Sequence, residues 1–167
     1  MDLQLNRLDI GYILGKMQLD ILFLDIDGVL NPDKAKNTTS FDPGCVAELK
    51  RFFAARPDTR IVFSTSWRLG FPFFVLGWLW HHHDLPLQAV VGRTPAIAPD
   101  QRGREVRKWL QDAPTLHLGC KIRRFAALDD EIEPLMGWVP RPSLFRCDPC
   151  HGLTPAITDQ LIRHFSA

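Results

Sequence analysis

The chain has 167 residues, of which 46% are hydrophobic and 23% are charged, and its formal net charge is +1. This length and composition belong to one folded domain with a sizeable core, which excludes a disordered chain. A net charge this close to zero gives the molecule no general attraction for nucleic acid or for acidic membranes.

Residues 1–16 carry scattered apolar side chains among charged ones and lack the continuous apolar core of a secretory signal. Met17 stands directly before the first predicted strand. We therefore expect residues 1–16 to be an N-terminal extension and residues 17–167 to form the domain. The longest apolar run, residues 71–80, is interrupted by Pro and Gly and is too short to span a bilayer, so we expect a cytoplasmic protein.

The first strand leads into two carboxylates. Residues 21–24 are Ile, Leu, Phe and Leu, and a strand that is apolar on both faces belongs in the middle of a parallel sheet covered by helices. Asp25 and Asp27 follow, and side chains two residues apart in extended chain point the same way. Gly28 then allows the chain to turn. Open α/β sheets bind ligands beyond the carboxyl ends of their strands, so the acid pair predicts a metal or catalytic site rather than an ordinary surface turn.

A helix and a second strand come next. Asp42 and Pro43 are typical of an N-cap and a first helical residue, and apolar residues recur after them at helical spacing to about Arg56. The strand at residues 60–63 delivers the string Ser-Thr-Ser-Trp-Arg at 64–68 to the edge of the sheet where the two aspartates lie. Hydroxyl groups therefore join the acids there.

A helix that begins at Pro72 and runs towards His83 is apolar almost all round. Such a helix is either buried in the core or covered by a partner. Its aromatic residues make the segment 71–80 a candidate face for a homodimer.

The second half of the chain continues the alternation of strands and helices. Strands are predicted at 87–91, 124–128 and 143–146, and helices at 104–111 and 154–165. The strand that ends at residue 128 is also followed by polar residues, and these are again acidic. The alternation predicts an α/β protein with a three-layer, Rossmann-like fold, in which helices flank a central parallel sheet of about five strands.

The chain has four cysteines, which we expect to be reduced thiols in a protein without an export signal. Cys147, Cys150 and His151 match the C-x-x-C-H pattern of covalent haem attachment, and the two cysteines are also compatible with a zinc or redox site. Haem attachment requires export, so an incidental pair of loop cysteines is the default interpretation.

Three strand ends thus supply an acid pair, a hydroxyl cluster and a second acid pair, and basic residues precede the last of these. Carboxylates from two strands repel each other unless a hard cation lies between them, and Mg2+ suits a site built from oxygen ligands. Hydroxyls and cationic side chains in the same crevice suit a phosphoryl group. The combination predicts phosphoryl transfer.

The order of these motifs resembles the haloacid dehalogenase (HAD) superfamily of phosphohydrolases. The first HAD motif, D-x-D-G-[TV]-L after a strand, is similar to residues 25–30, and Asn31 is a common companion of it. The second, a Ser or Thr that closes the next strand, is similar to Thr65. The fourth, an acidic pair after an apolar strand, is similar to Asp129 and Asp130.

The third HAD motif is a Lys or Arg near the start of a later helix. Arg102 matches it best, and Arg104 and Lys108 remain open for the same role. The resemblance extends over about residues 18–165, and the four motifs together are specific, although the second and third alone are weak.

The resemblance implies a role for each matched residue. Asp25 would attack phosphorus and form an aspartyl-phosphate, and Asp27 would protonate the leaving oxygen and then activate water. Thr65 and Ser66 would bind the phosphate. Arg102 would neutralise charge on the phosphate and the nucleophile.

The resemblance also implies a magnesium site. Asp25, the backbone carbonyl of Asp27, Asp129 and Asp130 would hold Mg2+, which offsets the charge that develops in transfer. Thr65 and Arg102 also have structural interpretations. Thr65 could be an ordinary hydroxyl at a strand end, and Arg102 could be a surface residue at the start of a helix. For the two acid pairs together, a purely structural explanation is much weaker.

Further strings are similar to a narrower branch, the small HAD domains associated with RNA-repair proteins. They include Val-Gly-Arg-Thr-Pro at 91–95 and Leu-Asp-Asp-Glu at 128–131. HAD enzymes that act on small metabolites commonly carry a cap domain that closes over the reaction, and segments 31–41 and 93–101 are too short for one. We therefore expect an open site without a sizeable cap, and as substrate an accessible phosphate on a nucleic-acid end or a nucleotide.

Two other classes of protein share part of this pattern. A signalling receiver domain also combines clustered aspartates, a Thr, a Lys and Mg2+ on a parallel sheet, but its acid pair is usually adjacent on the first strand, whereas this chain has D-x-D. A catalytically silent interaction module would fit the aromatic segment 71–80. The presence of both Asp25 and Asp27 argues against a domain that has lost its catalytic activity.

Overall fold

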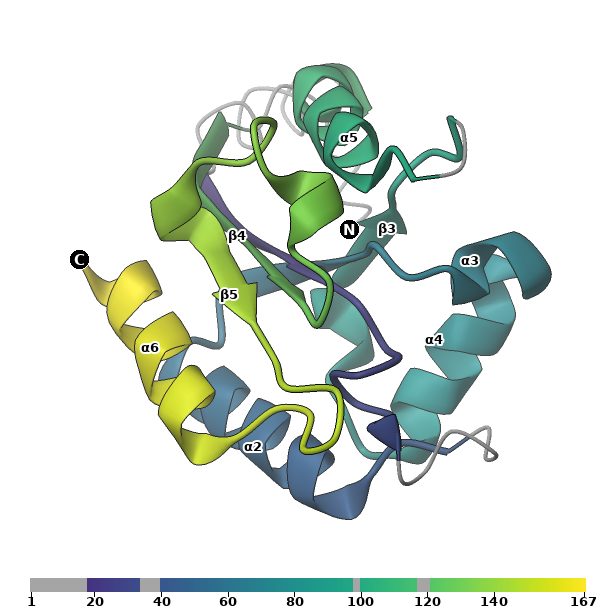
Figure 1. The fold of residues 1–167 in the computed structure, drawn as a ribbon, viewed down its shortest axis with the longest axis vertical. Helices are drawn as coiled ribbons and strands as arrows, with labels where there is room; N and C mark the ends of the chain where they lie inside the picture. The colour runs from purple at the N-terminus through teal and green to yellow at the C-terminus, as the bar shows by residue number, and fades with distance from the viewer. Residues whose placement is uncertain (1–17, 34–39, 98–99, 117–120) are drawn as a thin grey trace, which may run out of the picture.

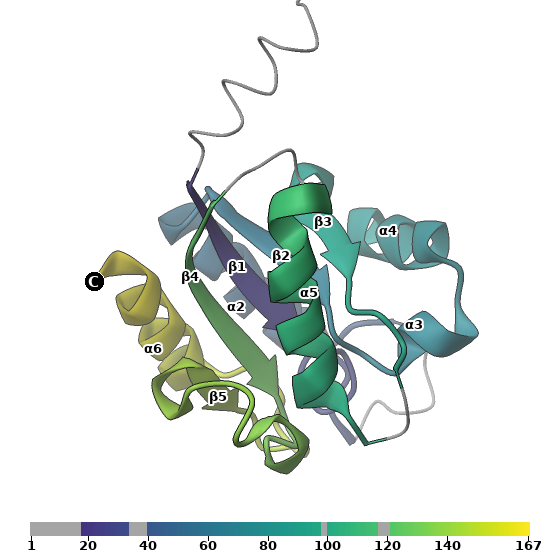
Figure 2. The ribbon, with the colours of Figure 1, turned by 90° about the horizontal axis from the view of Figure 1, so that it is seen from above.

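The computed structural model describes residues 18–33, 40–97, 100–116 and 121–167 (Figure 1). The predicted N-terminal extension, residues 1–16, lies outside the described residues. A single sheet runs through the described part, and helices lie on both of its faces (Figure 2). This is the three-layer, Rossmann-like arrangement that the sequence predicted.

The sheet has five strands in the order β3-β2-β1-β4-β5, and all neighbouring pairs are parallel. The strands are β1 (Gln18–Leu24), β2 (Thr59–Phe63), β3 (Val90–Arg93), β4 (Lys121–Asp129) and β5 (Leu144–Arg146). β1 occupies the centre, as its apolar sequence predicted, because both of its faces are covered by helices.

Four helices cover the sheet and short turns connect the remaining elements. The helices are α2 (Pro43–Ala55), α4 (Phe73–His82), α5 (Arg102–Leu116) and α6 (Pro155–Ser166). The 3-10 turns are η2 (Leu87–Ala89), η3 (Glu133–Leu135) and η4 (Arg141–Ser143). Leu22 and Leu24 of β1 pack with α2, α4 and α6, whereas Ile21 and Phe23 pack with α5. Successive side chains of β1 point to opposite faces of the sheet, so the strand contributes to one hydrophobic core on each face.

β3 differs from the strand predicted at 87–91. The amide of Ala89 donates to the carbonyl of Pro86 at 3.0 Å, which closes the turn η2, and pairing with β2 begins only afterwards. Gly92 lies inside the strand rather than ending it. A Cβ at that position would lie 3.3 Å from the indole Nε1 of Trp109 and would be crowded. A short apolar run does not itself distinguish a turn from a strand.

Two helices also differ from the prediction. α5 begins at residue 102 rather than 104 and continues to residue 116, because Ala113 extends its buried face. A four-residue helix, α3 (Trp67–Gly70), follows β2 and had no counterpart among the predicted elements. It is one turn long, so its sequence carries no helical periodicity.

The apolar helix α4 is two-sided. Leu76 and Trp80 are buried in the core, whereas the side chains of Phe74 and Trp78 are 75% and 63% exposed. None of the described helices has the length and apolarity that a membrane crossing requires.

The carboxyl ends of β1, β2 and β4 meet at one edge of the sheet (Figure 1). The connections that leave this edge after β1 and β3 span residues 25–42 and 94–101, which is too little chain for a cap domain. The absence of a sizeable cap was predicted, and within the described part of the chain it holds.

Candidate functional site

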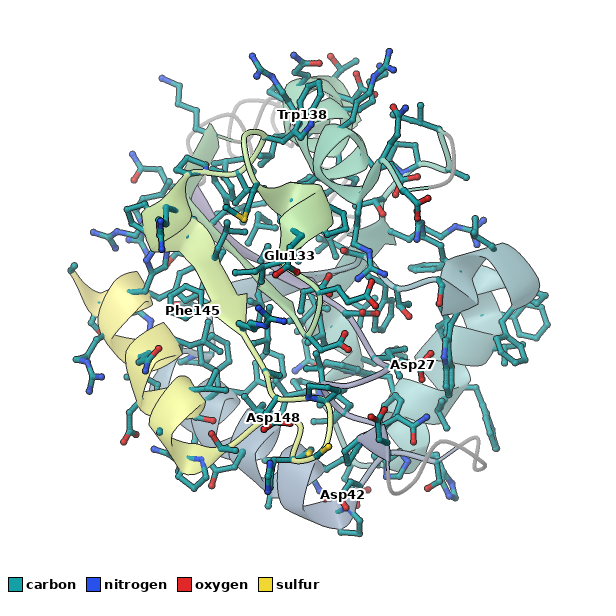
Figure 3. All side chains as sticks on the ribbon, in the orientation of Figure 1. Asp27, Asp42, Glu133, Trp138, Phe145 and Asp148 are labelled. Atoms are coloured by element: carbon teal, nitrogen blue, oxygen red, sulfur yellow. The ribbon has the colours of Figure 1, made fainter. Side chains whose placement is uncertain are left out.

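Two buried carboxylates lie side by side because β1 and β4 are paired in register. Leu24 pairs with Leu128, and the amide of Asp25 donates to the carbonyl of Leu128 at 3.0 Å. Asp25 and Asp129 follow at the strand ends and are 2% and 1% exposed. Asp130 comes next and is half-buried. Oxygen atoms of Asp25, Asp129 and Asp130 all lie within 4.8 Å of one another. Figure 3 shows the described side chains on the ribbon, with Asp27 among those labelled.

A single guanidinium bridges two of these acids. Arg102 is the first residue of α5, and its Nη1 donates to Asp25 Oδ2 at 2.8 Å and to Asp129 Oδ2 at 2.5 Å. Burial disfavours the charge on Arg102, but the two carboxylates outweigh it and raise the pKa of that side chain. Arg104 donates to Gln101 instead. Lys108 is exposed and forms an ion pair with Asp112 of the same helix. The geometry thus favours position 102 among the three candidates for the third motif.

One positive charge does not neutralise three carboxylates. Burial raises the pKa of Asp25, and burial together with the charge of Asp25 raises the pKa of Asp129 to about 7. Burial and Asp25 also raise the pKa of Asp130. The donor set is all oxygen and partly open to solvent, which fits a hard divalent cation such as Mg2+. The buried charge that the protein leaves uncompensated is what such a cation would relieve.

Asp27 lies beside this group but its carboxylate is held elsewhere. The indole Nε1 of Trp67 donates to Asp27 Oδ2 at 2.8 Å, and Asn31 Nδ2 donates to Asp27 Oδ1 at 3.1 Å. The Asp27 side chain is half-buried and is not part of the three-acid group. The predicted metal contact of this residue is through its backbone carbonyl, so the placement of its carboxylate leaves that prediction open.

The two predicted phosphate-binding hydroxyls differ in environment. Thr65 is fully buried, its side chain hydrogen-bonds Asp25, and its Oγ1 accepts the amide of Trp67 at 3.3 Å. Ser66 is exposed and lies with Arg102 in the lining of a cavity of about 400 Å³. The hydroxyl of Thr65 therefore contacts Asp25, whereas Ser66 lies in the wall of this cavity.

The turn after β1 depends on a glycine. Gly28 has a backbone φ of +69°, which residues other than glycine rarely adopt. A Cβ at this position would lie 2.3 Å from Cγ of Asp130, which is far inside contact distance. The motif therefore brings the Asp130 carboxylate against the backbone of the first turn.

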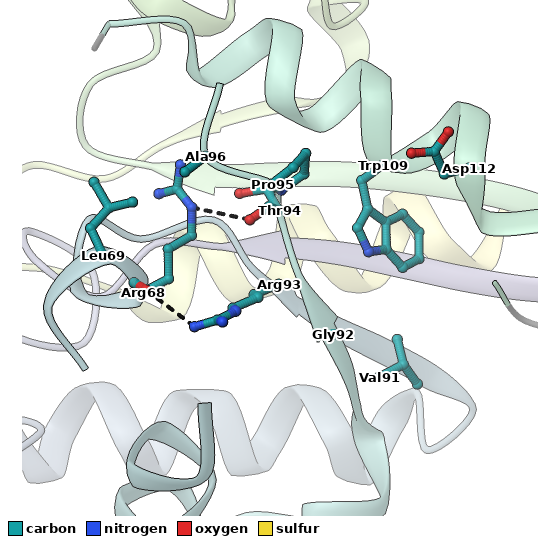
Figure 4. A pocket seen from close by; sticks show the side chains of 10 residues that line it. All are labelled: Arg68, Leu69, Val91, Gly92, Arg93, Thr94, Pro95, Ala96, Trp109 and Asp112. Carbon is teal, nitrogen blue, oxygen red and sulfur yellow. Dashed lines mark hydrogen bonds between the residues drawn. The ribbon is translucent and has the colours of Figure 1, made fainter. Parts of the chain in front are cut away.

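A buried ion pair that sequence analysis missed lies behind the acids. Arg68 of α3 pairs with Glu105 of α5, and both side chains are at most 6% exposed. Arg68 also donates to the carbonyl of Thr65 at 2.6 Å. A further hydrogen bond from Arg68 reaches the carbonyl of Thr94 at 3.2 Å (Figure 4). The position of Trp67 and Arg68 directly after the predicted hydroxyls was the only available signal, since their partners are distant in sequence.

A cavity of about 540 Å³ is lined by Arg68, Arg93 and Trp109 among others (Figure 4). A second cavity, of about 400 Å³, has Ser66 and Arg102 in its lining, so it adjoins two of the predicted phosphate-binding residues. The lining of neither cavity includes Asp25, Asp27, Asp129 or Asp130.

Cys147 and Cys150 lie in different environments. Cys147 is buried, Cys150 is exposed, and both are free thiols. Burial raises the pKa of the Cys147 thiol. Within the described residues the three acids are the one group whose ligand atoms converge, and Cys147, Cys150 and His151 are not part of it. The default interpretation of an incidental pair stays a prediction.

Comparison with known proteins gives one match. The family model described as "HAD domain in Swiss Army Knife RNA repair proteins" matches residues 21–157, which include all four predicted motifs. Neither a curated protein nor a solved structure matches the chain.

Proposed function

Because this chain belongs to the family of HAD domains in Swiss Army Knife RNA repair proteins, which implies a phosphatase-type activity, we propose that it is a Mg2+-dependent phosphatase with an aspartyl-phosphate intermediate. The observation that carries this proposal is the group of three carboxylates at the ends of β1 and β4, with Arg102 between two of them. A negatively charged, partly open site with a fixed cation suits a phosphate ester that is bound together with a divalent metal.

The proposed first step is attack by a carboxylate oxygen of Asp25 on phosphorus. A bond forms between Asp25 and phosphorus, the bond to the leaving alcohol breaks, and Asp27 gives a proton to the leaving oxygen. Thr65, Ser66 and Arg102 would hold the phosphoryl oxygens, and Arg102 also stabilises the ionised form of Asp25. In the second step Asp27 takes a proton from water, which attacks phosphorus and releases inorganic phosphate, and the Asp25 carboxylate is regenerated.

Mg2+ would be held by carboxylate oxygens of Asp25, Asp129 and Asp130 and by the backbone carbonyl of Asp27. When bound, the ion supplies positive charge that offsets the charge on the transferring phosphoryl group. The carboxylates of this chain would determine its position, since two of the three lie at the ends of paired strands and the third is held against Gly28.

We infer that the substrate is a phosphate on an exposed end, such as a nucleic-acid terminus or a nucleotide. Support comes from the description of the family and from the lack of a cap-sized connection above the strand ends. A substrate much larger than the site can approach an uncapped edge, whereas small metabolites are usually enclosed.

The alternatives weighed from sequence gain no support from the fold. A receiver domain has the flavodoxin-like strand order 2-1-3-4-5, whereas this sheet has the order 3-2-1-4-5. A catalytically silent module would not need a buried acid group with a bridging arginine. We further propose that the protein acts in the cytoplasm and that residues 71–80 form a homodimer face.

The proposal predicts that Asp25→Asn abolishes turnover. The change keeps the shape of the side chain but removes the nucleophilic charge, so phosphate release should fall by several orders of magnitude. We would measure phosphate release with and without Mg2+ from an aryl phosphate, mononucleotides, and DNA or RNA oligonucleotides with 3′ or 5′ phosphates.

Asp58→Asn provides the matched control, because Asp58 is exposed in the turn before β2. This variant should keep the activity of the parent protein. Equal activity of Asp25→Asn and the parent, or activity that survives removal of divalent metal, would contradict the proposed mechanism.

A further inference from the structure

Trp67 contacts both the proposed proton donor, Asp27, and the proposed phosphate-binding residue Thr65. Its indole N–H donates to Asp27 Oδ2 at 2.8 Å, and its backbone amide donates to Thr65 Oγ1 at 3.3 Å. The side chain of Thr65 in turn hydrogen-bonds Asp25. One residue of α3 therefore contacts the proposed proton donor with its side chain and the proposed phosphate-binding hydroxyl with its backbone.

A second donor holds the other oxygen of the same carboxylate. Asn31 Nδ2 donates to Asp27 Oδ1 at 3.1 Å, and Asn31 is 1% exposed. Two donors on opposite oxygens fix the rotation of the Asp27 carboxylate, since turning it would break both hydrogen bonds. Each oxygen keeps a further lone pair that can carry a proton. The arrangement orients the carboxyl group without blocking it.

We propose that Trp67 is a positioning residue, which holds the carboxyl group of Asp27 in the orientation that proton transfer to the leaving oxygen requires. The inference rests on the proposed function, because it assigns Trp67 a part in that reaction. Catalytic groups act efficiently only when their geometry is fixed to within a fraction of an ångström, so a residue that sets the orientation of an acid changes the rate.

The apolar contacts of Trp67 are made by its ring and not by its N–H. The indole ring packs on Phe71, with ring centroids 5.6 Å apart, and against the larger core, and a phenyl ring at position 67 could keep most of that packing. Trp67 is half-buried, so its N–H has access to the partly solvated site. The contact that distinguishes Trp from Phe here is the hydrogen bond to Asp27.

Leaving groups of different basicity distinguish positioning of the acid from a general structural effect. A nitrophenolate leaves without needing a proton, whereas a phenolate or an alkoxide needs one. The value of kcat/KM reports steps up to the first irreversible one, which includes departure of the leaving group. Loss of orientation at Asp27 should therefore slow esters of basic alcohols and spare esters of acidic ones.

The experiment compares Trp67→Phe with the parent on p-nitrophenyl phosphate, phenyl phosphate and glycerol phosphate in saturating Mg2+. We expect kcat/KM to fall about tenfold or more for phenyl and glycerol phosphate and by less than about twofold for p-nitrophenyl phosphate. The ratio of two such values does not depend on how much of the preparation is folded, so partial unfolding of the variant does not obscure the result.

Two further variants complete the test. Asn31→Ala should shift the ratio in the same direction, because it releases the other oxygen of Asp27. Trp80→Phe is the matched control: it removes an indole donor that binds the carbonyl of Pro86 at 3.1 Å, a contact with no part in the proposed mechanism, and should leave the ratio unchanged.

Each result bears on the inference. Equal losses on all three esters in Trp67→Phe, or no loss on any, would overturn the positioning role while the proposed phosphatase activity of the parent stands. A parent protein that hydrolyses none of the esters would overturn the proposed function and the inference with it.

Discussion

Gly28 and Asp130 are coupled by contact. The site for a carboxylate at position 130 exists because position 28 has no side chain, and the backbone there has φ of +69°. We predict that Gly28→Ala displaces the Asp130 carboxylate and weakens Mg2+ binding by roughly tenfold or more. Backbone strain should also cost about 1–3 kcal/mol of stability. Calorimetric titration with Mg2+ and thermal unfolding would measure the two effects.

Gly70 is the matched control, since a Cβ at that position would have nothing within 4 Å. Gly70→Ala should change neither Mg2+ affinity nor, by more than about 0.5 kcal/mol, stability. Unchanged Mg2+ affinity in Gly28→Ala would show that Asp130 is not a metal ligand.

The buried acids make stability depend on pH. Burial and the charge of Asp25 raise the pKa of Asp129 from 3.8 to about 7. Between these two values the folded state binds more protons than the unfolded state, so the stability of the metal-free protein should fall as the pH rises from about 4 to about 7. Above that range this contribution stays constant.

Bound Mg2+ should reverse this trend, because the ion competes with protons for the same oxygens. We predict that saturating Mg2+ raises the melting temperature by several degrees at pH 8 and much less at pH 5. The measurement is thermal unfolding across this range with and without the ion, and Asp129→Asn should remove most of the difference. An equal increase at both pH values would contradict the assignment of the buried carboxylates as ligands.

The Arg68–Glu105 ion pair joins three elements. Arg68 comes from α3, Glu105 from α5, and the segment after β3 is bound through Thr94 and through the amide of Ile97, which donates to Glu105 Oε1 at 3.0 Å. Removing one partner leaves a buried charge without compensation. We predict that Glu105→Gln lowers stability by about 3 kcal/mol or more, measured by urea unfolding.

An exposed pair provides the comparison. Glu133 and Arg146 are 3.0 Å apart, with more than half of each side chain exposed. Glu133→Gln should cost less than about 1 kcal/mol. Similar losses in the two variants would mean that burial does not determine the contribution of the Arg68–Glu105 pair.

Elements with strong periodicity could be predicted from sequence. β1 and α2 were found because an unbroken apolar run, an N-cap and a helical spacing are local signals. α3 was missed because one turn of helix has no period. β3 was predicted too early in the chain, because residues 87–89 form the turn η2 and pairing with β2 begins at Val90. A short apolar run does not show where pairing with a neighbouring strand begins.

The same division holds for the candidate site. The acids at positions 25 and 129 were predictable because each follows an apolar strand. The contacts of Trp67 with Asp27 and of Arg68 with Glu105 were not, because they join residues 40 and 37 positions apart. Arg102 could only be ranked above its neighbours until the structure placed it against the two carboxylates.

On the scale of the whole molecule, large apolar side chains are exposed on the outer face of α4 and beside it. Its side chains at Phe74 and Trp78 are 75% and 63% exposed, and nearby Leu69 is 66% exposed. Contiguous apolar patches are uncommon on monomers. If this surface is the proposed dimer face, the parent should sediment as a dimer at micromolar concentration, and the double change Phe74→Ser and Trp78→Ser should give a monomer.

The phosphatase activity of that double variant should match the parent, because neither side chain contacts the acids. A double change at exposed residues outside the face, Asp58→Ser and Glu133→Ser, should leave the sedimentation unchanged. A parent that sediments as a monomer would rule out the homodimer at that concentration.

The pairing of β1 with β4 places residues that are far apart in sequence next to each other. Asp25 and Arg102 are separated by 77 positions, and Arg102 and Asp129 by 27. Contacts of this range form slowly compared with helices, because a long loop must close before they are made. During refolding, helical circular dichroism should therefore return before activity does. The time at which activity returns would then report when β1 and β4 pair during refolding.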